Sequence, residues 1–89
     1  MIPNRTVMYE RHLEQISNLR KQCIEANTAA RAFSDYATIL TNVPTMGAIA
    51  DRSRDMLVEY ARKCAGDCRK LIDSNTVLAD KMEREGMPD

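Results

Sequence analysis

A seven-residue repeat of mostly apolar side chains runs through the first half of the chain, and it constrains the fold more than any other feature. Between about residue 5 and residue 41 the repeat forms two rows, offset by three positions. The rows are Tyr9, Ile16, Cys23, Ala30 and Ala37, and His12, Leu19, Ala26, Phe33 and Leu40. Such a pattern is typical of a helix that packs along one side against another helix. We therefore expect one long helix over residues 5–41.

A second repeat of the same period predicts another long helix over about residues 47–85. It has three adjacent rows, which are Leu57, Cys64, Leu71 and Leu78; Val58, Ala65, Ile72 and Ala79; and Ala61, Cys68, Asn75 and Met82. Three rows make an apolar face that is wider than one facing helix covers. The sequence therefore predicts that this helix needs a further packing partner.

Between the two repeats lies the one strong break in the middle of the chain, which contains Pro44 and Gly47. Proline and glycine interrupt helices, so we expect a turn over residues 42–46. Asn4 and Thr45 are good N-cap residues for the two helices. Asn42 can end the first helix in a left-handed conformation. The chain is then an all-α, antiparallel helical hairpin.

The segment 73–76, Asp-Ser-Asn-Thr, is a run of residues that favour caps and turns over helix interiors. One expectation is a kink or break there, which would produce a short third helix. The other is that the second helix continues and that Asn75 is a polar residue which fixes the register of the packed helices.

Small residues gather halfway along both repeats, and they predict close approach of the two helices. They are Cys23, Ala26, Ala29 and Ala30 in the first repeat, and Ala61, Cys64, Ala65 and Cys68 in the second. If the chain reverses near residue 44, position 23 lies opposite about position 65, and the two clusters meet. The same arithmetic places His12 opposite positions 75–76.

Composition bounds the chain to a single helical domain over residues 1–89. Its 13 basic and 13 acidic residues cancel, which argues against nucleic acid or an anionic membrane as a partner. No secretory signal and no membrane-spanning run is visible. The cysteine number is odd and fits no disulfide framework, so we expect reduced thiols and a cytoplasmic location.

Three cysteines raise the alternative of a metal site, because Cys64 and Cys68 are one helical turn apart and Cys23 can face them. Zinc usually takes four Cys or His ligands, and His12 is about 16 Å along the helix from Cys23. Buried cysteines behave as small apolar residues, which explains their spacing. We expect no metal, no cofactor and no catalytic set, because no acid and base can be placed together.

Basic residues at seven-residue spacing suggest a second function class. An oligomeric binder of an anionic small ligand such as a nucleotide would use Arg62, Lys63, Arg69 and Lys70 of the second helix. Acidic residues one turn away, such as Glu59 and Asp73, favour instead the ion pairs of a solvated helix face.

The favoured interpretation is a non-enzymatic protein-interaction module, a small regulator or inhibitor that binds a target protein through a helical face. It would self-associate as a homodimer or higher oligomer, in a coiled-coil-like bundle. The predicted contact residues, which flank the apolar rows, are Ile24, Ile39, Met56 and Ile72. By analogy of size and style alone, such chains are typical of phage accessory proteins.

Overall fold

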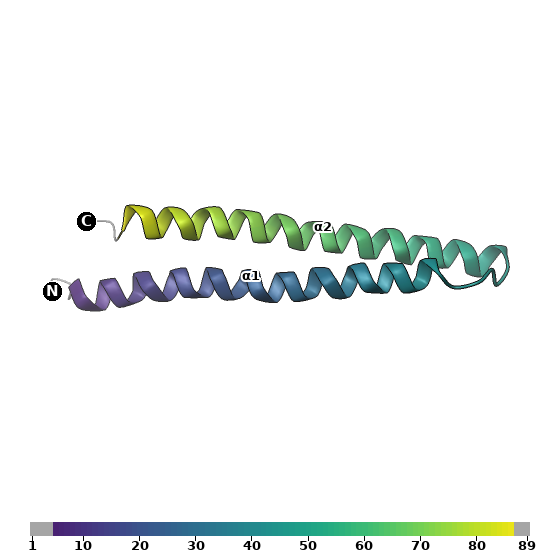
Figure 1. Cartoon of the computed structure of the whole chain (residues 1–89), viewed down its shortest axis with the longest axis horizontal. Helices are drawn as coiled ribbons and strands as arrows, with labels where there is room; N and C mark the ends of the chain where they lie inside the picture. Colours follow the sequence, from purple (N-terminus) through teal and green to yellow (C-terminus); the bar gives the residue numbers. More distant parts are fainter. Residues whose placement is uncertain (1–4, 87–89) are drawn as a thin grey trace.

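Two long helices packed side by side make up the computed structural model, which describes residues 5–86. Helix α1 spans Arg5–Thr41 and helix α2 spans Ala48–Glu85, and the chain between them reverses direction (Figure 1). The molecule is a rod of 69 × 23 × 14 Å. No strand and no third helix occurs within the described range. The predicted antiparallel hairpin and its helix boundaries are confirmed to within a residue or two.

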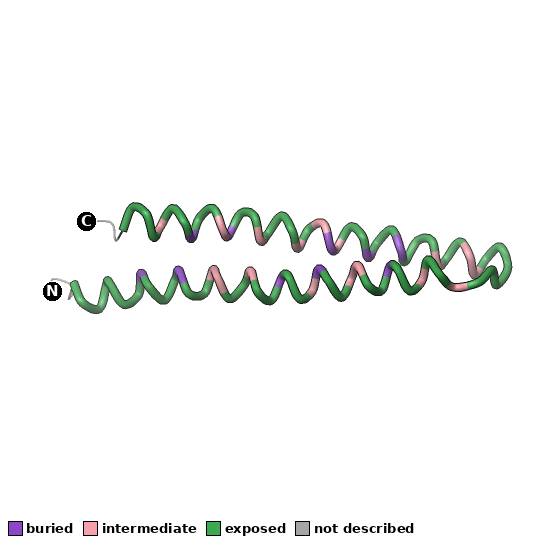
Figure 2. The backbone as a smooth tube through the Cα atoms, in the orientation of Figure 1, coloured by how far each residue is buried: buried purple, intermediate pink, exposed green. Residues whose placement is uncertain are grey.

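The buried residues follow one line along each helix, and these lines face each other (Figure 2). In α1 the line combines both predicted rows. In α2 only two of the three predicted rows face α1, namely those that contain Val58 and Ala61. The third row, which contains Leu57, lies beside the seam and is largely exposed. The buried positions are His12, Ile16, Ala26, Ala30, Ala37, Val58, Ala61, Ala65, Asn75 and Ala79.

Alanine dominates the seam, which is why the helices pack closely. Among the described residues, no large side chain is completely shielded from solvent. The one compact cluster consists of Ala37, Val58 and Ala61, and Phe33 and Leu40 pack against its edge. The hairpin therefore has a narrow core, which by itself provides little stabilisation.

The connection between the helices shifts their register relative to the expected one. Cys23 contacts the carbonyl oxygen of Ile72 and the hydroxyl of Thr76, each at 3.6 Å, and so it does not face position 65. The reason is that the connection runs on beyond the end of α1 before α2 begins (Figure 1). Non-helical chain advances about 3.3 Å per residue, against about 1.5 Å in a helix, so α2 starts well past Thr41.

This shift corrects three expectations. The two clusters of small residues are offset along the rod, and they do not meet midpoint to midpoint. Cys64 lies about 12 Å along α2 from Ile72, the residue that Cys23 contacts. His12 does not lie opposite Asn75, because the side-chain amide of Asn75 donates a hydrogen bond of 2.9 Å to the Gln22 side chain.

The helix ends also differ from the expected caps. Asn42 has no positive φ, so it does not adopt the left-handed conformation, and α1 ends in tightened turns such as Val43 N–H to Leu40 C=O. The N-cap of α2 is Gly47, with a φ of 111°, and not the expected Thr45. The backbone N–H of Met46 donates to the Asp51 carboxylate, which satisfies one donor at this end. The predicted cap Asn4 lies outside the described residues.

Helix α2 continues without a break through residues 73–76, so the expected kink and third helix are wrong. Two of the poor helix formers have partners across the seam. Asn75 is bonded to Gln22, and Thr76 is in contact with Cys23. Side chains that face α1 in this way do not compete for the backbone of their own helix, so the low intrinsic propensity of the segment is overridden.

Candidate interaction surface

One side of the hairpin is polar along most of its length. It consists of the residues that immediately follow the His12 row of α1 and the Ala61 row of α2, and we call it the polar flank. Arg20 on α1 reaches Asp80 and Glu83 on α2 at 2.7 and 3.0 Å. Arg69 donates a hydrogen bond of 3.1 Å to the Ser34 hydroxyl. These contacts join the helices, and because they are exposed to solvent they add little to the stability of the hairpin.

The opposite side of the hairpin is apolar or uncharged. Its α2 part is the predicted row that contains Leu57, whereas its α1 part was not singled out from the sequence. It consists of the residues that immediately precede the Tyr9 row of α1 and the Val58 row of α2. We call it the apolar flank, and its residues are Met8, Gln15, Gln22, Ala29, Tyr36, Leu57, Cys64, Leu71 and Leu78. A groove of about 270 Å³ runs between the helices here, with Gln15, Gln22 and Leu78 in its lining. The leucines at 57, 71 and 78 are each nearly half exposed.

A second apolar surface covers the outer side of α2 near the turn. Ile49, Met56 and Tyr60 are 85%, 64% and 65% exposed, and their spacing of seven and four residues places them on one line of the helix. We call this line the outer stripe. Met56 and Tyr60, with Glu59 and Lys63, line a shallow groove of about 460 Å³. The stripe therefore offers large apolar side chains away from α1.

The four predicted contact residues do not form one surface. Ile24, Ile39 and Met56 are all more than 60% exposed, but they lie on different helix faces. Only Met56 belongs to the outer stripe. Ile72 is half-buried in the seam, where its carbonyl accepts the Cys23 thiol, so it is a packing residue between the two helices. The seven-residue repeat already placed Ile72 in one row with Val58 and Ala79, and that row faces α1.

The basic residues considered for an anionic ligand do not converge on one site. Arg69 is bonded to Ser34, Lys63 lies by the outer stripe, and only Arg62 reaches a hollow of about 440 Å³ in the polar flank. Lys70 is exposed and lines none of these grooves.

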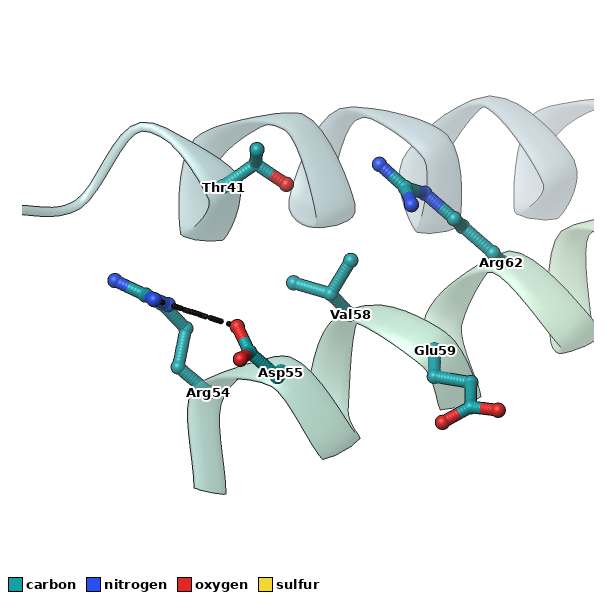
Figure 3. Close-up of a pocket in the computed structure, with 6 residues that line it drawn as sticks. All are labelled: Thr41, Arg54, Asp55, Val58, Glu59 and Arg62. Carbon is teal, nitrogen blue, oxygen red and sulfur yellow. Dashed lines mark hydrogen bonds and ion pairs between the residues drawn. The ribbon is translucent and has the colours of Figure 1, made fainter. Parts of the chain in front are cut away.

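The hollow also contains Arg54, Asp55 and Glu59. In Figure 3, Arg62 extends toward α1, and the Arg54 guanidinium is joined to Asp55 at 3.3 Å. An anion in this hollow would lie near the carboxylates of Asp55 and Glu59. The Arg54 guanidinium is already paired with Asp55, which leaves only that of Arg62 to bind the anion. The hollow is therefore poorly suited to a phosphate group.

The three cysteines are free thiols, and each is half-buried. Within residues 5–86 no group of three or more Cys, His, Asp or Glu side chains is arranged to hold a metal ion. Cys23 is used in the seam, where its thiol donates to the Ile72 carbonyl. Its small size lets α1 and α2 approach each other at that level.

Tyr60 and Cys64 interact where the outer stripe borders the apolar flank. A hydrogen bond to the Cys64 side chain is the main cause that raises the pKa of the Tyr60 phenol above 10.0, and interaction with the thiolate charge adds to it. The raised pKa favours the protonated phenol, so this contribution to stability is complete below about pH 10. It is lost as the pH rises through the folded-state pKa.

We expect Cys64→Ala to lower the pKa of Tyr60 toward its ordinary value, because the alanine side chain offers no acceptor. Ultraviolet titration of tyrosinate in the wild type and the variant measures the difference. Cys68→Ala removes a thiol that does not contact Tyr60 and is the control. Identical titration curves for wild type and Cys64→Ala would contradict the contact.

Comparison with known proteins gives no match, whether with family models, with curated proteins or with solved structures. Neither α1 nor α2 contains a stretch that is long and apolar enough to cross a membrane.

Proposed function

We propose that the chain is a non-enzymatic protein-interaction module, which associates with itself and presents a helical face to a target protein. The observation that carries this proposal is the imbalance of burial. The seam buries mainly alanine-sized side chains, whereas many of the larger apolar side chains stay exposed. An isolated chain of this size with so narrow a core is marginally stable, and binding another protein adds the missing burial.

The outer stripe supports a helical target in particular. An amphipathic helix binds through apolar anchors one or two turns apart, which is the spacing of Ile49, Met56 and Tyr60. Glu59 and Lys63 beside the stripe can pair with charges of either sign on the rim of such a target. By covering the surface of its target, the module would act as a regulator or inhibitor. We place it in the cytoplasm, since its three thiols are free and Cys23 serves in packing.

Affinity capture with matched variants tests target binding. The double variant Met56→Glu with Tyr60→Glu should capture at least about tenfold less of the target than the wild type, because charged side chains replace two apolar anchors. Val77→Glu is the control, since Val77 is 68% exposed further along the same helix. The set of captured proteins, measured by mass spectrometry, should be shared by wild type and control. If all three baits capture the same proteins equally, the outer stripe binds no target.

A further inference from the structure

We infer that the apolar flank is the surface on which two copies of the chain associate, as a four-helix bundle that leaves the polar flank and the outer stripe exposed. This inference rests on the proposed function and assigns the self-association to particular residues. Three observations favour a second copy as the occupant of this flank.

The first observation is that the apolar flank carries no charged side chain at any of its nine positions, from Met8 to Tyr36 and from Leu57 to Leu78. The polar flank, by contrast, contains the charged residues Arg20, Arg62, Arg69 and Glu83. Two-fold association brings the same patch of two copies together, so like charges would oppose it. An uncharged patch that is rich in leucine avoids this repulsion, and the net charge of zero adds none over longer range.

The second observation concerns area. The chain exposes 7054 Å², whereas a compact protein of the same mass exposes about 5,300 Å². The difference of roughly 1,700 Å² per chain matches what each subunit of an obligate homodimer buries, which is about 1,000–2,500 Å². A second hairpin laid along the first would therefore bring the exposed area per chain to that of a compact protein of the monomer's mass.

The third observation is length. The uncharged rows extend along nearly the whole of the 69 Å rod, from Met8 near one end to Leu57 near the turn. A short helix would cover only part of such a surface. A second copy has the same length and a flank of the same composition, so it covers the rows from end to end.

The test is the mass of the chain in solution at micromolar concentration, measured by sedimentation equilibrium. We expect the wild type to have twice the monomer mass of 10.1 kDa. Leu71→Glu combined with Leu78→Glu should raise the dissociation constant by about 100-fold or more. Val77→Glu should remain a dimer, because Val77 is adjacent in sequence to Leu78 but points away from the flank.

A photo-crosslinking residue keeps the inference testable if the double variant does not fold. Incorporation of p-benzoylphenylalanine at position 71 should yield a covalent dimer, and incorporation at position 77 should not. A monomeric wild type, or crosslinking at 77 and not at 71, would overturn the inference. A monomer that still captures its target through Met56 and Tyr60 would leave the proposed target binding intact. A dimer that captures no target would support the flank assignment alone.

Discussion

Replacing Ala65 with leucine is expected to lower the free energy of unfolding by about 2–3 kcal/mol, although leucine is the more apolar residue. Ala65 is only 1% exposed, in a seam built from alanines. A larger side chain there forces the helix backbones apart or adopts a strained rotamer. Urea unfolding, followed by circular dichroism at one fixed protein concentration, measures the change.

The matched control is Ala32→Leu on the exposed side of α1. Alanine and leucine have similar helix propensities, so this variant should change the stability by less than about 0.5 kcal/mol. If Ala65→Leu were as stable as the control, or more stable than the wild type, close packing at the seam would be wrong.

Removing the guanidinium of Arg54 should destabilise the hairpin by about 1–2 kcal/mol. Arg54 donates a hydrogen bond of 3.0 Å to the Val43 carbonyl, which fastens the extended connection to the start of α2. It also pairs with Asp51 and Asp55, and its side chain is only 18% exposed. Arg54→Ala leaves all three acceptors without this donor, and thermal unfolding followed by circular dichroism measures the loss.

Arg52→Ala removes an exposed arginine two residues away and should leave the melting temperature nearly unchanged. Arg54→Lys should recover only part of the loss, because an ammonium group does not reproduce the fork of donors. Equal melting temperatures for the two alanine variants would show that the connection is held without Arg54.

The helices themselves could be predicted because their repeat is long and consistent. Over α1 and α2, each seam position recurs every seven residues for five or more turns, and Pro44 and Gly47 mark the only interruption. Such redundancy tolerates misleading local signals. The poor helix formers at 73–76 failed to break α2 because Asn75 and Thr76 have partners on α1.

The register could not be predicted, because it depends on the shape of a few residues between the helices. A helical or tightly folded connection would place position 23 near position 65. The extended connection, fastened by Arg54 to Val43, moves α2 along the rod instead. This conformation is determined by contacts that form only once the chain is folded.

The exposed apolar surfaces were predicted in part. The wide apolar face of α2 was expected, and Met56 does lie on the outer stripe. Which of the three rows would face α1 could not be decided from the repeat alone, so Ile72 was named among the surface contact residues although its row faces α1. Ion pairs between the helices, such as Arg20 with Glu83, distinguish the two flanks. Which residues pair depends on the register, so the flanks could not be told apart from the sequence.

The connection that extends past Thr41 gives the rod two poles of different character. Arg5 and Gly86 lie together at one pole, while Ile49 and Met56 lie toward the other, in a molecule 69 Å long. Anything joined to the chain near Arg5 or Gly86 is thus held tens of ångströms from whatever docks beside the reversal. The outer stripe, proposed above as the surface for a target, therefore lies toward the opposite end of the rod from Arg5 and Gly86.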